Sequence, residues 1–279
     1  MTDEALDPTA ILAELGTTTL PRSVRCSTTV GSTMDLARES LATLPDEHLP
    51  LLITAELQTS GRGRLGRSWE APSGTALLAS LALRPTWLAP ERGAALAWMI
   101  AVALCAAVEE VTGIRPGLKW PNDLLVPLRA TDTSAPAPAP AWAKAAGLLL
   151  EVSLNAQGFD WAIIGFGVNV SAAPPPTATL YPATSLVEAA GAPVSRLALL
   201  RALLRQLDHW HARLIAGDEA ALFAAWRARL LTLGQQVSIE TANGTVVGSA
   251  EDVDRAGGLL VRDATGTLHL ITTGDVGLI

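Results

Sequence analysis

The segment Gly61–Trp69 (GRGRLGRSW) constrains the fold of this 279-residue chain more than any other. It places Arg62, Arg64 and Arg67 close together and separates them with glycines. Glycine weakens the interior of a helix or a strand, so neither element suits this composition. Guanidinium groups on a loop can close over a carboxylate or a phosphate. The segment therefore predicts an anion-binding loop, although an exposed arginine-rich turn has the same composition.

The distribution of charge favours a small anion over nucleic acid as the ligand. The chain has 20 basic and 27 acidic residues and a net charge of −7, so no positive field covers its whole surface. Almost all of the basic residues are arginines, and the two lysines are Lys119 and Lys144. Lysine differs from arginine as a compact point charge with an adjustable pKa. Both lysines lie in the motifs described below, which makes them candidate functional residues.

Cysteine content and apolar patterning exclude several classes of protein. Cys26 and Cys105 are too far apart for a metal motif and too few for a disulfide framework. The acidic N-terminus is unlike a signal peptide. The most apolar run, residues 94–108, is shorter than a membrane span. The sequence therefore predicts a cytoplasmic globular protein with no metal site of its own and no membrane partner.

The order of expected strands and helices predicts an α/β (α+β) fold with two domains. Residues 1–22 are expected to form an N-terminal extension, residues 23–232 a catalytic domain and residues 233–279 a small C-terminal domain. In the last region, short strands alternate with Asn-Gly and Gly-Gly turns, which is typical of a small antiparallel β-barrel. The extension is too short for a helix-turn-helix domain, so no nucleic-acid partner is expected.

Within residues 23–232, apolar runs predict strands separated by helices. The expected strands cover residues 24–30, 51–57, 74–83, 124–126, 148–154 and 161–170, and the expected helices cover 90–111, 195–215 and 219–231. A further helix begins at Ser32, which forms a capping box with Asp35, and a short one is expected around residues 10–15. Residues 127–142 are rich in alanine, proline, serine and threonine, which predicts a surface insertion.

Together these motifs make the chain similar to the biotin–protein ligases, the enzymes that attach biotin to carrier proteins. Four blocks match in order, and a fifth fits the strand that follows them. The blocks are Gly31–Thr33, Gly61–Trp69, Lys119–Asp123 (KWPND), Lys144–Glu151 (KAAGLLLE) and Gly165–Val170 (GFGVNV). The resemblance extends over about residues 24–275, so it includes both expected domains.

The resemblance implies a fold, a reaction and a set of partners. It implies a catalytic domain like that of class II aminoacyl-tRNA synthetases, with a mixed, mostly antiparallel sheet and flanking helices. Biotin and ATP would form biotinyl-5′-AMP and pyrophosphate, with Mg²⁺ bound to the phosphates, and biotin would then pass to a lysine of a biotin carboxyl carrier domain of an acyl-CoA carboxylase. Some relatives carry a DNA-binding domain and repress transcription, which is not expected here. A monomer or a weak homodimer is expected.

The resemblance also assigns a role to each matching residue. Biotin and its adenylate would be bound by Ser32, Thr33, Met34, Gln58, Gly61, Arg62, Gly63, Arg64, Lys144 and Gly147. ATP would be bound by Arg67, Trp69, Lys119, Asn122, Asp123 and Asn169. Lys144 and Arg64 are the expected catalytic residues. Lys144 would bind the carboxylate and α-phosphate oxygens, and Arg64 would slow the escape of the intermediate.

Several of these residues have an ordinary structural alternative. Ser32 is a favourable helix N-cap in any protein, and Asp123 and Asn169 are common turn residues. If Asp123 is functional, it either faces biotin or helps to deprotonate the incoming lysine. Trp69 either stacks on adenine or anchors the loop. Glu56 and Gln58 are both expected at the mouth of the arginine loop.

Two other functions remain open from the sequence. A lipoate– or octanoate–protein ligase would use the same chemistry with another acid in the pocket, although the complete Arg/Gly loop favours biotin. A non-catalytic relative would bind biotin without activating it, although both lysines are present. Residues 171–185 are expected to contain an adenine-contacting loop, but no residue there matches the family convincingly.

Overall fold

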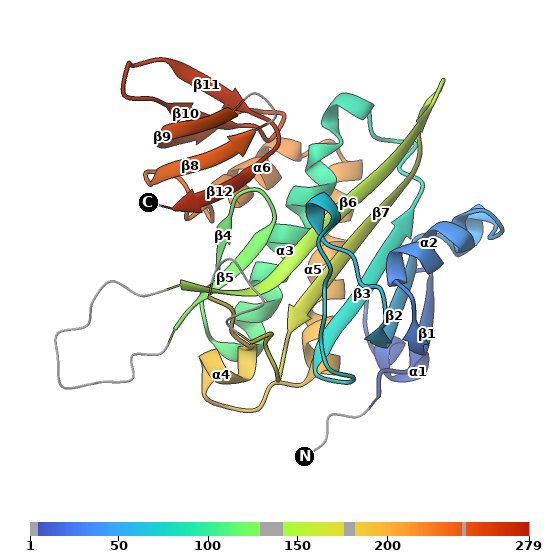
Figure 1. The fold of residues 1–279 in the computed structure, drawn as a ribbon. Coiled ribbons are helices and arrows are strands. Elements are labelled where there is room, and N and C mark those ends of the chain that lie inside the picture. Colours follow the sequence, from blue (N-terminus) through green and yellow to red (C-terminus); the bar gives the residue numbers. More distant parts are fainter. Residues whose placement is uncertain (1–4, 129–141, 176–181, 242–243, 279) are drawn as a thin grey trace.

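The chain folds into a large sheet covered by helices and a smaller sheet formed by its C-terminal part (Figure 1). This computed structural model describes residues 5–128, 142–175, 182–241 and 244–278. Most of the expected insertion, residues 129–141, lies outside the described residues, and so do residues 176–181. The predicted α/β fold is confirmed.

The large sheet has seven strands in the order β1-β2-β3-β7-β6-β5-β4. Their bounds are β1 Ser23–Val30, β2 Leu51–Gln58, β3 Ala76–Leu83, β4 Gly117–Lys119, β5 Asp123–Pro127, β6 Trp142–Asn155 and β7 Gly158–Asn169. β1 and β2 are parallel, and every other neighbouring pair is antiparallel. The sheet is therefore mixed and mostly antiparallel, as the resemblance implied.

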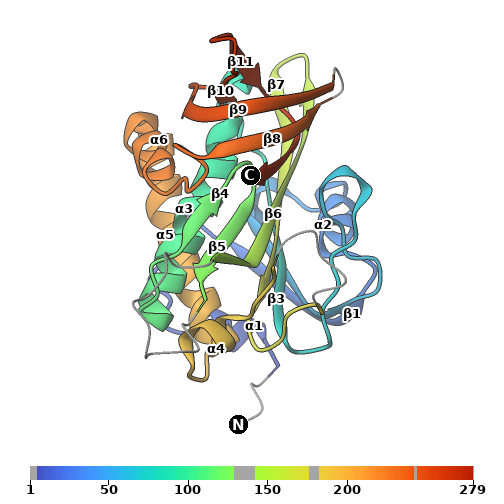
Figure 2. The same cartoon turned by 60° about the vertical axis from the view of Figure 1, so that its left-hand side comes forward.

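Helices cover both faces of this sheet. Three helices lie on one face, namely α3 Ala94–Thr112, α5 Arg196–Ile215 and α6 Glu219–Arg227. The opposite face carries α2 Thr33–Leu41, as Figure 2 shows. Alternate side chains of β2 point to opposite faces of the sheet. Leu52 packs in the core under α3 and α5, whereas Leu51 and Ile53 pack under α2. Two short helices, α1 Pro8–Leu12 and α4 Leu186–Ala190, complete the set.

The most apolar helix is a core element. Residues 90–112 form the one helix of the described chain that is long and apolar enough to cross a membrane, and 67% of its most apolar window is buried inside the protein. Trp98 stacks on Trp226 and contacts Phe223 edge to face, so it is a packing residue. Gly113 ends the helix in the left-handed conformation, with φ of 70°.

The small sheet has five antiparallel strands in the order β11-β10-β9-β8-β12. They are β8 Gln236–Thr241, β9 Gly244–Val253, β10 Leu259–Arg262, β11 Leu268–Ile271 and β12 Asp275–Leu278. The sequence did not predict β12, which pairs with β8 and forms one edge of the sheet. The expected small barrel is thus an antiparallel sheet with β11 and β12 at its two edges.

The small sheet is attached to the helices and to the large sheet by polar and aromatic contacts. Trp120 donates a hydrogen bond of 2.9 Å from its indole nitrogen to the carbonyl oxygen of Gly257. The guanidinium of Arg255 lies 4.3 Å from the ring centre of Phe223 on α6. β12 forms the edge of the small sheet that lies beside the arginine loop, and its first residue, Asp275, forms an ion pair with Arg67 of that loop.

Several elements differ from the sequence prediction because they depend on partners elsewhere in the chain. The first helix begins at Pro8, where Asp7 caps it, and not near residue 10. β6 begins at Trp142, so Lys144 lies inside a strand and not before it. β4 and α4 were not predicted. Short elements such as these carry little periodicity, and neighbouring strands or helices stabilise them.

Candidate active site

A cavity of about 700 Å³ lies between the arginine loop, the large sheet and β12, a size typical of small-molecule sites. Every predicted site residue except Gly61 lines it. The predicted lining residues are Ser32, Thr33, Met34, Gln58, Arg62, Gly63, Arg64, Arg67, Trp69, Lys119, Asn122, Asp123, Lys144, Gly147 and Asn169. Segments far apart in the sequence therefore meet at one site, which excludes the alternative of an isolated arginine-rich turn.

Gly61 differs from its prediction, because it lies on the outer side of the loop and not in the cavity. A Cβ atom at this position would overlap the carbonyl oxygen of Trp69. The backbone nitrogen of Trp69 donates a 2.9 Å hydrogen bond to the carbonyl oxygen of Gly61. Glycine is thus required here so that the two ends of the loop can meet.

One end of the cavity is formed by a buried hydrogen-bond network. The backbone nitrogen and the hydroxyl of Thr33 both donate to Oε1 of Gln58, at 2.8 and 3.0 Å. The Thr33 hydroxyl also lies 2.8 Å from that of Ser80 on β3. Ser32 caps α2 by accepting a hydrogen bond from the backbone nitrogen of Met34. These groups present polar atoms in fixed positions at the N-terminal end of a helix.

Glu56 does not join this end of the cavity, contrary to the prediction. Its carboxylate forms an ion pair of 2.6 Å with Arg196, which is almost fully buried at the start of α5. It also accepts a hydrogen bond from the backbone nitrogen of Leu6. Glu56 thus stabilises the packing of α5 and the N-terminal segment against β2.

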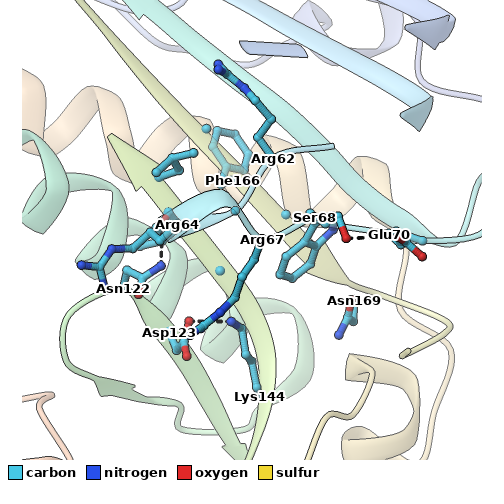
Figure 3. A pocket seen from close by; sticks show the side chains of 18 of the residues that line it. Arg62, Arg64, Arg67, Ser68, Glu70, Asn122, Asp123, Lys144, Phe166 and Asn169 are labelled. Atoms are coloured by element: carbon cyan, nitrogen blue, oxygen red, sulfur yellow. Dashed lines mark hydrogen bonds and ion pairs between the residues drawn. The ribbon is translucent and has the colours of Figure 1, made fainter. Parts of the chain in front are cut away.

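The floor of the cavity carries an ion pair on neighbouring strands. Nζ of Lys144 on β6 lies 2.7 Å from Oδ1 of Asp123 on β5, and Figure 3 shows the two side chains pointing toward each other. Only 12% of the Asp123 side chain is exposed, so the pair is weakly screened by solvent. The strands fix both Cα positions, and the carboxylate orients the ammonium group.

Lys119 on β4 is the second cation of the floor, and it is buried. The pKa of Lys119 is lowered to about 8, mainly by burial. Asp123 acts in the opposite direction, and the nearby charges of Lys144, Arg67 and Arg64 contribute to the lowering. The positive charges around Lys119 repel a further cation, and the same charges attract a polyanion.

Asn122 connects the floor to the loop. Its amide nitrogen donates to the carbonyl oxygen of Leu148 at 2.7 Å, and its amide oxygen accepts from Arg64 at 3.3 Å. Arg64 also donates to the carbonyl oxygen of Gly274 at 3.4 Å. Within the described residues Arg64 forms no ion pair, and burial lowers the pKa of its guanidinium. Its positive charge is thus available to a bound anion.

The loop folds back on itself over the cavity. The backbone nitrogen of Gly63 donates to the carbonyl oxygen of Arg67 at 2.7 Å, which closes a turn. Leu65 and Gly66 lie at the tip of this turn with φ of 55° and 75°. A positive φ is unusual for leucine, and the Leu65 side chain is exposed. Arg67, next to the tip, forms an ion pair with Asp275 of β12.

Trp69 ends the loop and lies against the sheet. A Cβ atom at Gly147 would come within 2.9 Å of its indole ring, and one at Gly167 within 2.6 Å of its Nε1. Two glycines on neighbouring strands therefore make room for the ring, which supports the anchoring interpretation of Trp69. Its Nε1 is buried and has no hydrogen-bond partner among the described residues.

Asn169 lies at the end of β7 on the same side of the cavity. Its amide nitrogen donates to the carbonyl oxygen of Thr184 at 3.2 Å. Its Oδ1 is buried, and within the described part of the chain it has no hydrogen-bond partner. A buried acceptor without a partner is costly unless a ligand, an ion or water satisfies it.

Sequence reasoning missed several residues of the cavity. The additional lining residues include Ser68, Glu70, Leu148, Leu149, Gly165, Phe166, Gly167, Ala183, Asp275 and Val276. The alternation Gly165-Phe166-Gly167 inside a strand was the available signal, because glycine in a strand marks a close approach of another group. At Gly165 that group is the sulfur of Met34, which an added Cβ would meet at 2.6 Å. Asp275 and Val276 gave no signal, because β12 itself was not predicted.

The described lining carries more positive than negative side chains. Its cations are Arg62, Arg64, Arg67, Lys119 and Lys144, and its carboxylates are Glu70, Asp123 and Asp275. The protein as a whole has a net charge of −7, so the charge of the cavity lining is opposite in sign to the net charge of the protein. Such a concentration of cations in a partly buried site favours anionic ligands.

Comparison with known proteins places this fold and cavity in a family. The model of the biotin/lipoate A/B protein ligase family matches residues 27–169, and that of the biotin protein ligase C-terminal domain matches residues 232–278. The chain belongs to the biotin/lipoate A/B protein ligase family.

Relatives in this family include two bacterial proteins. The biotin–[acetyl-CoA-carboxylase] ligase of Mycobacterium tuberculosis is 34% identical over 232 residues, which cover 81% of this chain and 78% of that protein. The bifunctional ligase/repressor BirA of Bacillus subtilis is 30% identical over 229 residues, which cover 81% of this chain. The match spans 66% of the length of the Bacillus protein.

The fold is also similar to solved structures. A biotin protein ligase from Aquifex aeolicus in complex with biotin and ATP superimposes with a TM-score of 0.72 and 24% identity, covering 92% of this chain and 98% of that chain. At this identity the similarity concerns the fold alone.

Proposed function

We propose that the protein is an ATP-dependent biotin–protein ligase. It activates biotin to biotinyl-5′-AMP and transfers the biotin to a lysine of a biotin carboxyl carrier domain of an acyl-CoA carboxylase. The observation that carries this proposal is the convergence of Arg64, Lys119 and Lys144 on one cavity beside the polar pocket of Thr33 and Gln58. Family membership supports it, and so does the similarity to the biotin–[acetyl-CoA-carboxylase] ligase of Mycobacterium tuberculosis.

In the first step a carboxylate oxygen of biotin attacks the α-phosphorus of ATP. The bond from that phosphorus to the bridging oxygen breaks, and pyrophosphate leaves with the electron pair. Negative charge accumulates on the α-phosphate oxygens, and Lys144, which pairs with Asp123, would stabilise it. Arg64, which lacks a carboxylate partner among the described residues, would hold the adenylate in the cavity. Ser32, Thr33 and Gln58 would hold the ring end of biotin.

In the second step the uncharged amine of the carrier lysine attacks the acyl carbon of the mixed anhydride. The bond from that carbon to the phosphate oxygen breaks, AMP leaves, and the amine loses a proton as the amide forms. The loop from Gly61 to Trp69 covers the reactive anhydride and limits its exposure to water. Asp123 is engaged by Lys144, so its role in this proposal is to orient that ammonium group.

Mg²⁺ fits this site as a companion of the nucleotide. Asn169 lines the cavity, and its Oδ1, which is buried without a hydrogen-bond partner among the described residues, would be an oxygen ligand of the ion. Oxygen ligands of this kind suit Mg²⁺, which also keeps phosphate oxygens and water in its coordination shell. When bound, the ion would neutralise phosphate charge. Lys119 and Asn122 would bind the nucleotide beside it.

We further propose a domain organisation for the chain. Residues 23–232 form the catalytic domain, residues 233–279 the small C-terminal domain, and residues 1–22 an extension. The enzyme acts in the cytoplasm as a monomer or a weak homodimer. Beyond Gly147, β6 pairs only with β7 among the described residues, and this open sheet edge is a suitable surface for weak association.

The decisive experiment measures ATP–pyrophosphate exchange by the purified protein with biotin, lipoate or octanoate, each with and without Mg²⁺. Exchange that depends on biotin alone supports the proposal. Exchange with lipoate or octanoate would instead assign the protein to the lipoate branch of the family. No exchange with any acid, together with measurable binding of biotin, would identify a non-catalytic relative.

A further inference from the structure

Four charged side chains form a closed network on the outer side of the arginine loop. Nη2 of Arg62 lies 3.1 Å from Oε1 of Glu151 and 3.3 Å from Oδ1 of Asp35. Nη1 of Arg38 lies 2.9 Å from the same oxygen of Asp35, and Nη2 of Arg38 pairs with Glu151. Each carboxylate is therefore shared by both guanidinium groups. We call these four residues the clasp.

The clasp joins three elements that surround the predicted biotin end of the cavity. Asp35 and Arg38 lie on α2, whose first residues, Thr33 and Met34, line the cavity. Glu151 lies on β6, in the sequence block that begins at Lys144. The block that resembles the biotin–protein ligases extends to Glu151, and the resemblance implies no role for this residue.

Arg62 contributes its charge to the clasp, in contrast to Arg64. Figure 3 shows its side chain directed away from Lys144 and Asp123. Both partners of Arg62 are carboxylates, whereas Arg64 contacts only the neutral oxygens of Asn122 and Gly274 among the described residues. The two arginines of the same loop are thus used differently.

Contacts within the loop connect Arg62 to the rest of it. Residues Arg62 and Ser68 form an isolated antiparallel bridge, and Gly63 bonds to Arg67 across the same turn. The carbonyl oxygen of Gly61 accepts a hydrogen bond from the backbone nitrogen of Trp69, which lies against the sheet. Fixing Arg62 therefore restricts the backbone that carries Arg64 and Arg67 over the cavity.

We propose that Glu151 is a positioning residue that, together with Asp35, holds the arginine loop in its closed arrangement before any ligand binds. Sharing each carboxylate between two arginines lowers the entropy lost per ion pair, because a side chain fixed by one contact is already ordered for the next. The side chains remain partly exposed, between 27% and 45%, so the clasp weakens with salt and can release the loop. This role deepens the proposed ligase function and rests on it.

Trypsin tests the proposal without any ligand, because the loop contains three arginines. The experiment compares cleavage after Arg62, Arg64 and Arg67 in the unliganded wild type and in Glu151→Gln, with fragments identified by mass spectrometry. Loss of the charged carboxylate should increase the rate of loop cleavage about fivefold, and added salt should bring the wild type toward the variant. Equal cleavage rates in the two proteins would overturn the proposal.

The matched control is Glu251→Gln. Glu251 forms an ion pair with Arg262 in the small sheet, far along the chain from the loop, and its substitution removes one partly exposed pair of the same kind. Loop cleavage should stay at the wild-type rate in this control. Faster loop cleavage in both variants would indicate general destabilisation and would also overturn the assignment.

Kinetics separate positioning from a merely structural role. In Glu151→Gln the KM for biotin should rise about fivefold with kcat of pyrophosphate exchange changed less than about twofold, and Glu151→Asp should restore part of the loss. A fall in kcat with unchanged KM would overturn the proposal. If the wild type neither binds biotin nor exchanges pyrophosphate, the ligase function fails, whereas the trypsin result still reports on the clasp.

Discussion

The floor and the loop of the cavity both supply cations, but they hold them in different ways. On the floor, Lys119, Asp123 and Lys144 lie on strands of the large sheet, and Lys119 and Asp123 are buried. In the loop, 49% of the Arg67 side chain is exposed, and Leu65 adopts a positive φ. The floor therefore presents charge at positions that the sheet fixes, whereas the position of the loop depends on a few side-chain contacts of its arginines.

This difference indicates how the work of the site is divided. Charge that is fixed before the reaction costs no reorganisation during it, which suits stabilisation of a transition state. Charge on a loop that a few contacts hold suits admission and retention of a ligand. Changes to the floor should therefore affect the rate of the chemical step, and changes to the loop should affect binding.

The largest effect is expected for Lys144→Ala. Lys144 is proposed to stabilise charge on the α-phosphate, so removing its ammonium group should lower the rate of pyrophosphate exchange by at least about 10²–10³-fold, the range seen when a single charge-stabilising donor is lost. Biotin binding, measured by calorimetry, should be weakened but still detectable.

The control for this variant is Arg205→Ala. Arg205 forms an exposed ion pair with Glu110, and it does not line the cavity. Its substitution should leave exchange unchanged. Wild-type exchange in Lys144→Ala would refute the role of Lys144.

The second effect tests the contact between loop and floor. In Gly167→Ala the new methyl group would lie within 2.6 Å of Nε1 of Trp69 and would displace the indole from the sheet. Overpacking of this kind costs about 1–3 kcal/mol, so kcat/KM for biotin should fall about tenfold or more. Steady-state kinetics and the melting temperature report the two consequences separately.

A second substitution distinguishes this clash from general damage to the sheet. The double variant Gly167→Ala, Trp69→Phe replaces the indole with a smaller ring and should recover part of the melting temperature lost in the single variant. An unchanged kcat/KM in Gly167→Ala would show that the loop and the floor do not depend on each other.

The motifs of the sequence predicted most of the cavity, because the required chemistry limits the residue types. Arg64, Lys119 and Lys144 lie in motifs that resemble those of the biotin–protein ligases, and their roles were expected from that resemblance. The predicted strands and helices also formed, since their apolar periodicity is strong. Roles set by contacts between distant residues were not accessible, as shown by Glu56, which pairs with Arg196, and by Asp275, which reaches Arg67 from the other sheet.

The third effect concerns pH and the floor alone. The pKa of Lys119 is about 8 in the unliganded protein, and bound phosphates favour its charged form. ATP binding should therefore take up a proton above that pH, and the KM for ATP should rise about fivefold between pH 8 and 9, approaching the limit of tenfold per pH unit. Below pH 7.5 the KM should not depend on this group.

Lys119→Arg tests whether Lys119 causes this dependence. Arginine stays charged throughout the range, so the rise in KM above pH 8 should disappear in the variant. Measurements at saturating biotin and constant ionic strength isolate the pH dependence of the KM for ATP. A KM that falls with rising pH in the wild type would contradict the assignment of a cationic Lys119 to the phosphates.

The smallest effect is expected where the loop meets the small sheet. Asp275 pairs with Arg67, and both side chains are partly exposed, so the pair contributes only about 0.2–1 kcal/mol. The Asp275 carboxylate lines the same cavity and competes with phosphate for Arg67. Asp275→Asn should therefore lower the KM for ATP about two- to fivefold and leave kcat unchanged. Asp252→Asn is the control, because Asp252 pairs with Arg227 outside the cavity. A higher KM in Asp275→Asn would mean that Asp275 holds Arg67 ready for the nucleotide, and the loop would then share the fixed character of the floor.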